Sequence, residues 1–120
     1  MSEPALVIER ESRGAGVVVL VLSGELVVTS REALRETAEA ELVSGARHLV
    51  VAVDRLSHID TTGLATLVWL AGRCEERGGR MAVVGLKREV QEMRQHLFLD
   101  EAIRFTDDVD RAIAVVTRPG

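Results

Sequence analysis

Short apolar runs alternate along this chain with segments of helical periodicity. The runs at residues 5–10, 17–23, 49–53, 81–86 and 103–105 are too short for typical helices, and they predict five strands. The run LVVAV at 49–53 shows no surface alternation, as expected for a strand that is buried on both faces. We therefore place that strand at the centre of a sheet. The glycine-containing turn SRGAG, which joins the first two runs, predicts a hairpin.

Four other segments carry helical patterns: residues 29–44, 63–77, 87–98 and 106–116. Thr29 and Glu32 fit a capping box at the start of the first of these helices. Thr106 or Asp107 is expected to cap the last one, because either side chain can accept a hydrogen bond from a free backbone N–H in the first turn.

The helix at 63–77 is the most apolar of the four. Its first two turns are apolar on most sides and its last turn is charged, so we expect the first half to be buried. Trp69 and Cys74 are expected to pack in the core, since tryptophan and free cysteine are usually buried. The glycine pair at 78–79 ends this helix.

The predicted order of elements is ββαβαβαβα. Strands that alternate with helices pair in parallel through right-handed crossovers, while the hairpin adds an antiparallel strand. The fold class is therefore α/β: a single domain with a mixed, mostly parallel sheet of about five strands, an N-terminal hairpin and about four helices. We expect one domain over residues 1–120, with a core at about 5–116 and frayed ends at 1–4 and 117–120.

Composition narrows the functional classes. The 120 residues are 47% hydrophobic, which is enough for a core without disulfides or metals, and the single cysteine fits a reducing, cytoplasmic compartment. A net charge of −4 and few aromatic residues disfavour nucleic-acid binding, so a protein partner is the better expectation. We also expect no membrane insertion, because no apolar run approaches the length of a span.

The stretch SHIDTTGL at residues 57–64 follows the central strand and opens the apolar helix. Open α/β folds usually present functional groups at this end of a strand. Asp60, Thr61 or Thr62 can cap the helix, and Gly63 permits close backbone approach. Alternatively, one threonine takes up a phosphoryl group, which the unpaired N–H groups and the helix dipole would stabilise. From the residues alone, both interpretations stay open.

This region resembles the central segment of STAS domains, the fold of bacterial anti-sigma factor antagonists. In that family a strand leads to Asp-Ser/Thr-Ser/Thr-Gly-Leu at the start of a helix, as in LVVAVDRLSHIDTTGLATLVWL here. The similarity continues upstream in VLSGELVVTSREALRE and downstream from GGRMAVVGL to DDVDRAI, with glycines at the family's positions Gly24 and Gly85. It covers roughly residues 5–116.

The resemblance implies a partner-switching function. The hydroxyl residue directly after the aspartate, here Thr61, would be phosphorylated by an anti-sigma factor serine/threonine kinase with a histidine-kinase-like ATPase fold. The unphosphorylated protein would bind that kinase, and a PP2C-type phosphatase would restore binding. The protein would be a substrate and a ligand, with no catalytic residue of its own. The implied partner-binding residues are Gly24, Asp60, Thr61, Thr62, Gly63 and Leu64.

Three positions depart from the usual antagonist pattern. Val27 stands where many antagonists have aspartate, and Phe98 replaces a glycine at the end of the third helix, where it is expected to alter the helix exit or to form an exposed anchor. Thr61 replaces the commoner serine, as in stressosome-type members and in the small subunit of phospholipid-transport ABC systems. A non-catalytic scaffold in one of those assemblies is therefore the alternative function.

Other chemistry is poorly supported. Ser57, His58 and Asp60 include the residue types of a hydrolase triad, but neighbours on one short segment do not easily reach the required geometry. The three histidines lack metal-ligand spacing, and the chain has no phosphate-binding glycine motif, so we predict no metal and no cofactor. A solvated helix face is expected for Lys87, Arg88 and Arg94.

Overall fold

The computed structural model describes residues 5–118 and contains one five-stranded sheet. Its strands are β1 (Leu6–Ser12), β2 (Val17–Leu26), β3 (His48–Ile59), β4 (Met81–Val84) and β5 (Arg104–Thr106). Its helices are α1 (Arg31–Val43), α2 (Thr61–Glu76), α3 (Gln91–His96) and α4 (Val109–Thr117), with the short 3-10 turns η1 (Arg88–Val90) and η2 (Leu99–Glu101). The predicted fraying of residues 1–4 and 119–120 lies outside the described residues, and Thr117, expected in the loose end, closes α4.

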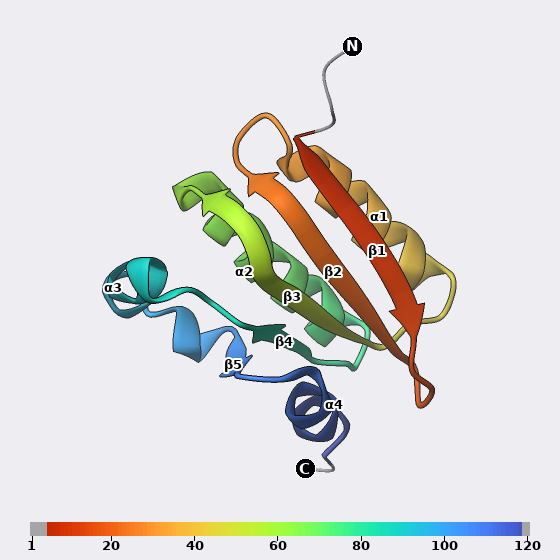
Figure 1. Ribbon diagram of the computed structural model, residues 1–120. Coiled ribbons are helices and arrows are strands. Elements are labelled where there is room, and N and C mark those ends of the chain that lie inside the picture. The colour runs from red at the N-terminus through yellow and green to blue at the C-terminus, as the bar shows by residue number, and fades with distance from the viewer. Residues whose placement is uncertain (1–4, 119–120) are drawn as a thin grey trace.

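The strands lie in sequence order across the sheet. β1 pairs antiparallel with β2, and every other neighbouring pair is parallel, so β3 is the central strand. The prediction of a mixed, mostly parallel sheet with an N-terminal hairpin is therefore confirmed. Since β2 and β3 are parallel, their carboxyl ends meet at the same edge of the sheet, where the segments leading to α1 and α2 also start (Figure 1).

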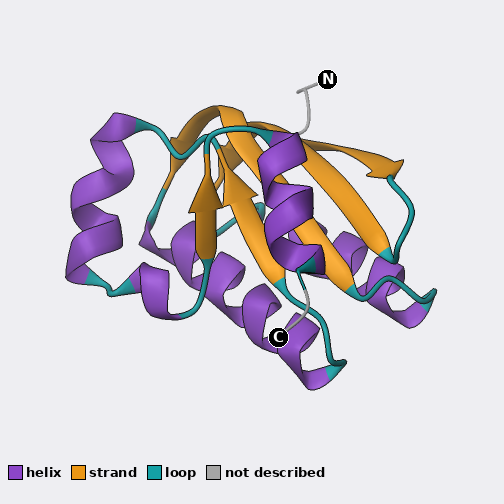
Figure 2. Ribbon diagram, turned by 90° about the horizontal axis from the view of Figure 1, so that it is seen from below, coloured by secondary structure: helices purple, strands orange, loops and turns teal. Residues whose placement is uncertain are grey.

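Helices cover both faces of the sheet. The larger core lies between the sheet and α1 and α2, while α4 covers the opposite face with a smaller core (Figures 1 and 2). In the larger core, Leu34, Ala38 and Leu42 of α1 share one face, as their spacing predicts. In the smaller core, Ala112 and Val116 of α4 pack on alternate residues of the central strands.

The central strand runs six residues beyond the predicted end at 53. Sequence patterning ends the strand there because Asp54 and Arg55 are polar, and both are exposed in the structure. The pairing between β2 and β3 shifts register at this point, which returns Leu56 to the larger core. Ser57 and His58 therefore belong to the strand, and not to the turn before α2.

The predicted capping box of α1 is wrong. The N-cap of the helix is Ser30, and no side chain caps its first turn. The Ser30 hydroxyl instead accepts a hydrogen bond from Val27 N (3.0 Å) and donates one to Glu25 O (2.7 Å). The serine thus stabilises the tight turn before the helix, which sequence spacing between Thr29 and Glu32 does not reveal.

The predicted cap of α4 at Thr106 or Asp107 is wrong. Asp108, and not Thr106 or Asp107, accepts a hydrogen bond at its Oδ1 from Arg111 N (2.7 Å). The Thr106 hydroxyl donates to the Asp108 carbonyl (3.0 Å), so it orders the turn that leads to the cap. Thr106, Asp107 and Asp108 can each cap a helix, so the residue at which the backbone turns into the helix decides which of them does.

The helix predicted at 87–98 is broken into η1 and α3. Lys87 and Arg88 are exposed, as expected for a solvated face, but Lys87 precedes η1 and its Nζ donates to Leu56 O (2.5 Å). Arg94 is half-buried, pairs with Asp100 and stacks on Phe105, so it departs from that prediction. Phe98 has φ +51° and is 69% exposed, which shows that the bulky residue occupies the left-handed conformation usually taken by glycine and leaves its ring in solvent.

Trp69 is not a core residue, contrary to the prediction. It is 39% exposed on α2, and the Arg35 guanidinium of α1 lies over its ring, 4.3 Å from the centroid. Cys74, five residues further on, is fully buried as predicted, and burial raises the pKa of its thiol to about 12. The helix buries one side against the sheet, so apolar residues on its other side remain at the surface.

Candidate functional site

The motif at the start of α2 lies against the loop that joins β2 to α1. We call residues 26–30 and 57–64 together the switch region. The two segments of this region are joined by a hydrogen bond from Asp60 N to Leu26 O (3.2 Å), across more than thirty residues of sequence. The contact follows from the parallel pairing of β2 and β3, because the chain leaves both strands at one edge.

Asp60 is the cap of α2 and also holds the neighbouring loop. Its Oδ1 accepts a hydrogen bond from Gly63 N (2.8 Å) and its Oδ2 accepts one from Val28 N (3.2 Å). The sequence left the cap open between Asp60, Thr61 and Thr62, and the structure assigns it to the aspartate. Both carboxylate oxygens are thus bonded to backbone amides, which leaves the threonines outside the capping interaction.

Gly63 allows the helix entry to approach β2. A Cβ atom at this position would lie 2.3 Å from Leu26 O and 2.9 Å from the Ile59 side chain. No side chain fits there without displacing the backbone. Leu64, the next residue, is fully buried in the larger core. Gly63 and Leu64 therefore support the switch region from beneath and do not form its surface.

Thr61 presents its side chain to solvent at the first residue of α2. Its hydroxyl makes no hydrogen bond with any side chain or backbone group among residues 5–118. Thr62 is half-buried, and Thr66 one turn later is buried, with its hydroxyl bonded to Thr62 O (2.9 Å). Of these three hydroxyls, that of Thr61 is the one most accessible to a modifying enzyme.

The loop beside Thr61 adds an apolar contact to this surface. Val28 is 58% exposed, and its backbone is held by Asp60 on one side and by the Ser30 turn on the other. Val27, at the position where many antagonists have aspartate, is half-buried and uses its N–H and carbonyl in the same turn. Sequence reasoning missed Val28 and Ser30, because nothing local links them to a motif some thirty residues away.

Gly24 has a structural role that its backbone explains. Its φ is +96°, and a Cβ atom there would lie 2.2 Å from Ala5 O. Its carbonyl accepts a hydrogen bond from the Ser57 hydroxyl (3.1 Å). Ser57 and Asp60 both bond to backbone groups. Within the part of the chain that the structure describes, no hydrogen bond joins Ser57, His58 and Asp60 as a hydrolase triad would require.

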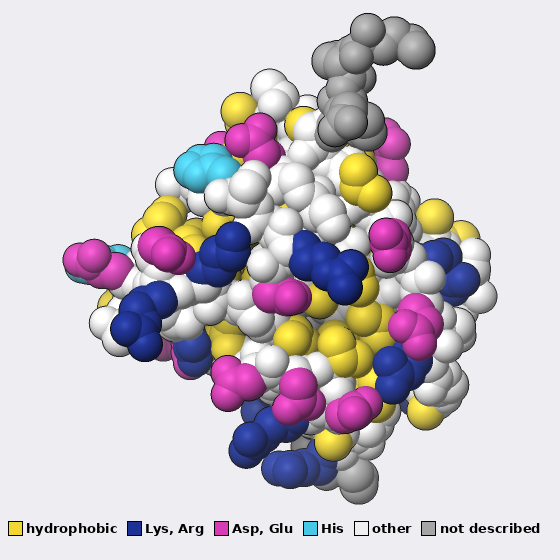
Figure 3. Space-filling view, in the orientation of Figure 1, with side chains coloured by type: hydrophobic (Ala, Val, Ile, Leu, Met, Phe, Trp, Pro, Cys, Tyr) yellow, Lys and Arg dark blue, Asp and Glu magenta, His cyan; other side chains and the backbone are white. Residues whose placement is uncertain are grey.

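The surface shows mixed charge. On the face opposite α1 and α2, hydrophobic side chains lie among acidic and basic ones, and the described residues seen there form no continuous basic area (Figure 3). Among residues 5–118, no cluster of His, Cys, Asp or Glu is arranged to hold a metal ion. Within the same residues, no helix is long and apolar enough to cross a membrane.

Replacing Asp60 by alanine should destabilise the protein far more than the same change at Thr61. The Asp60→Ala variant loses the cap bond and the bond to Val28 N, so we expect its free energy of unfolding to fall by about 1 to 2 kcal/mol. Thr61→Ala removes an exposed side chain with no bonded partner in the described chain, so its effect should stay within about 0.5 kcal/mol. Urea denaturation of both variants measures the difference, and equal losses would contradict the assignment of the cap.

Comparison with known proteins identifies the family. The family model of the STAS domain matches residues 10–112, which includes the whole switch region. The chain belongs to the STAS domain family. No curated protein sequence matches it significantly. The resemblance in the motif and the order of elements is thereby confirmed at the level of the family.

Solved structures share the STAS fold over nearly the whole chain. An anti-sigma factor antagonist from Mycobacterium paratuberculosis has a TM-score of 0.82 at 20% identity, covering 98% of this chain and 100% of that one. A putative antagonist from Thermotoga maritima gives 0.83 at 20% identity, with 92% and 95% covered. The phosphorylated form of the Bacillus cell fate determinant SpoIIAA gives 0.71 at 21% identity, with 91% and 98% covered. At these identities the likeness establishes the fold.

Proposed function

We propose that this STAS protein is an anti-sigma factor antagonist whose binding is switched by phosphorylation of Thr61. One observation carries the proposal: the Thr61 hydroxyl is exposed at the start of α2, while the neighbouring Asp60 provides the cap. A phosphoryl group can therefore be added without removing a bond that holds the fold. This separation of modification from stability is what a reversible switch requires.

The surroundings of Thr61 make the modification effective. A phosphoryl group adds about −1.5 to −2 charges at neutral pH, beside the Asp60 carboxylate and next to the exposed Val28. The N-terminal end of α2 stabilises that charge within the protein. A partner packed over Thr61 and Val28, in contrast, would have to accommodate a new and poorly screened anion. The folded state thus tolerates the phosphate better than a complex does.

In this proposal the partner is an anti-sigma factor serine/threonine kinase with a histidine-kinase-like ATPase fold. The unphosphorylated protein sequesters the kinase in the cytoplasm, phosphorylation releases it, and a PP2C-type phosphatase reverses the modification. Gly24, Asp60 and Thr62 would shape the contact surface, and Gly63 and Leu64 would support it. SpoIIAA, called an anti-sigma factor antagonist, is known in unphosphorylated and phosphorylated forms that match this fold equally, with TM-scores of 0.71. That pair supports a phosphorylated state with the same fold.

Phosphorylation should occur at Thr61 and not at Thr62. Incubation with ATP and a candidate kinase from the same cell, followed by mass spectrometry of the peptide, locates the phosphate. We expect Thr61→Ala to abolish incorporation, Thr61→Ser to retain it and Thr62→Ala to retain it, because Thr62 is half-buried in the first turn.

Phosphate found on Thr62 alone, or incorporation that persists in Thr61→Ala, would overturn the site. If no kinase of this class modifies either threonine, the switch itself is contradicted. A scaffold role in a stressosome or in a phospholipid-transport ABC system would then be the better explanation for the exposed threonine and the capping aspartate.

A further inference from the structure

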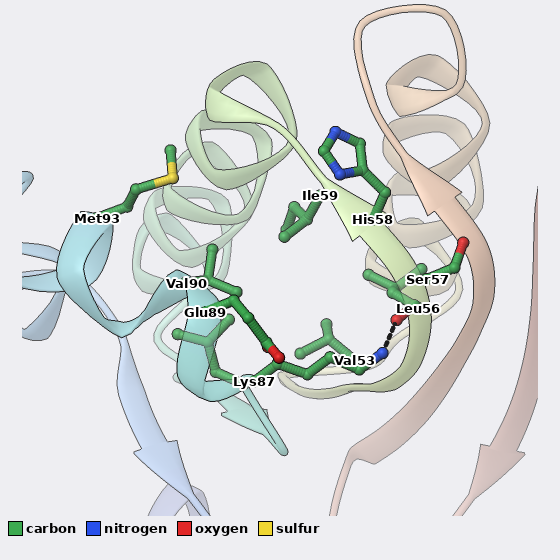
Figure 4. Close-up of a pocket in the computed structure, with 10 residues that line it drawn as sticks. Val53, Leu56, Ser57, His58, Ile59, Lys87, Glu89, Val90 and Met93 are labelled. Carbon is green, nitrogen blue, oxygen red and sulfur yellow. Dashed lines mark hydrogen bonds between the residues drawn. The ribbon is translucent and has the colours of Figure 1, made fainter.

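A second surface feature shares Ser57, His58 and Ile59 with the switch region, but its lining does not include Thr61. A pocket of about 480 Å³ opens between the carboxyl-terminal half of β3 and the η1–α3 segment (Figure 4). Val53, Leu56 and Ile59 line it from the strand. Val90 and Met93 face them from the other side. Its volume falls within the range of small-molecule sites.

The lining of this pocket is mainly aliphatic. Its apolar residues are Val53, Leu56, Ile59, Leu86, Val90 and Met93. The one ring among its lining residues is the imidazole of His58, an exposed residue near the end of β3, so the walls themselves are aliphatic. Aliphatic walls that include the adaptable Met93 suit a hydrocarbon chain.

Lys87 gives the pocket a positive charge. It is the only lysine in a chain with 15 lysine and arginine residues. Its side chain runs along one edge of the pocket, and its Nζ donates to Leu56 O (2.5 Å) (Figure 4). Among residues 5–118 it forms no ion pair, and an ammonium group has three donors, so two N–H groups remain for a ligand.

No other polar group of the pocket forms an ion pair with this ammonium in the described chain. The Ser57 hydroxyl is bonded to Gly24 O, and His58 is an exposed residue on the strand. Glu89 is exposed and lies within no ion-pair distance of Lys87, so water screens its carboxylate. Lys87 and Glu89 make the lining neutral overall, but no ion pair joins them in the described chain. The two remaining N–H groups of the ammonium can therefore bind an anion that carries an apolar body.

We propose that this pocket binds an aliphatic monocarboxylate of medium chain length. The carboxylate would accept hydrogen bonds from Lys87 Nζ at the edge of the pocket, and the hydrocarbon chain would lie between Ile59 and Met93. The Lys87 ammonium favours a carboxylate over an alcohol or a cationic amphiphile. The aliphatic walls favour a hydrocarbon chain over an aromatic anion. The site is separate from the Thr61 hydroxyl, and the proposal does not depend on phosphorylation.

Calorimetric titration of the full chain with decanoate, below its micelle-forming concentration, tests the proposal. We expect saturable binding with one site, and weaker or absent binding of decanol and decyltrimethylammonium at matched concentrations. Methyl resonances of Ile59, Val90 and Met93 should shift during the titration, which locates the chain. Because no kinase takes part, failure here leaves the phosphorylation test unaffected.

Two variants separate the role of Lys87 from general surface charge. Lys87→Gln keeps length and polarity but removes the charge, and it should weaken decanoate binding at least about tenfold, since a hydrogen bond to a charged group is lost. Arg88→Gln removes the same charge from the neighbouring residue, which does not line the pocket, and should leave binding unchanged. Equal binding of decanol and decanoate, an unchanged affinity in Lys87→Gln, or no binding at all would each overturn the proposal.

Discussion

Replacing Gly63 by alanine should lower the free energy of unfolding by about 1 to 3 kcal/mol. The new methyl group would lie 2.3 Å from Leu26 O, and that oxygen belongs to the backbone of a buried strand end. Since the carbonyl cannot rotate away as a flexible side chain would, α2 must move from β2. That movement also strains the bond between Gly63 N and Asp60, so the cap and the fold are weakened together.

Gly72, on the same helix, provides a matched control. A Cβ atom there meets nothing within 4 Å, so Gly72→Ala should stabilise the protein by about 0.5 to 1 kcal/mol through the lower entropy of the unfolded chain. Urea denaturation of both variants, analysed with a common m-value, measures the opposite signs. If the two substitutions change stability in the same direction and by the same amount, the result would contradict a close approach between Gly63 and Leu26 O.

Phosphorylation of Thr61 should weaken binding to the proposed partner, an anti-sigma factor kinase, on the order of 100-fold. Juxtaposed like charges at an interface cost several kcal/mol, and the phosphate would join the Asp60 carboxylate within the same contact. Thr61→Glu should weaken binding in the same direction but less, because one carboxylate carries less charge than a phosphate. Thr61→Ala should bind like the wild type and stay bound in the presence of ATP.

Affinities of the four forms, measured by surface plasmon resonance at two salt concentrations, test this expectation. Higher salt should reduce the difference between the phosphorylated and unmodified proteins, since screening weakens an electrostatic penalty near the surface. Thermal melts of the same samples show whether each form is folded. Equal affinity of the phosphorylated and unmodified proteins for the kinase would contradict the switch.

Local patterning was sufficient for much of the fold. Apolar runs such as 49–53 and the glycine-containing turn before Val17 located the strands and the hairpin, and alternation with helices gave the parallel pairing. These features depend on neighbours within a few residues and on the general handedness of crossovers. The same reasoning ended β3 too early, because a register shift lets the strand continue through two exposed polar residues.

Helix details were less predictable where tertiary contacts compete with local ones. Ser30 and Asp108 occupy the cap positions that spacing had assigned to neighbouring residues. Trp69 stays at the surface because α2 buries a different side, and Lys87 leaves its helix to reach a strand carbonyl. For Trp69 and Lys87 a contact with a distant segment outweighs a local preference of at most about 1 kcal/mol. For Ser30 and Asp108 the hydrogen bonds of the adjoining turn decide.

The order of residues was enough to recognise the family, to place the motif after the central strand and to select Thr61 as the candidate residue. The folded chain was needed to show that Asp60 caps the helix, that it holds Val28 in the neighbouring loop, and that the Thr61 hydroxyl is left exposed. A residue's type and its near neighbours set its local propensity. The hydrogen-bond partners of a carboxylate depend instead on which backbone amides lie near it, and here the parallel strands bring those amides to one edge of the sheet.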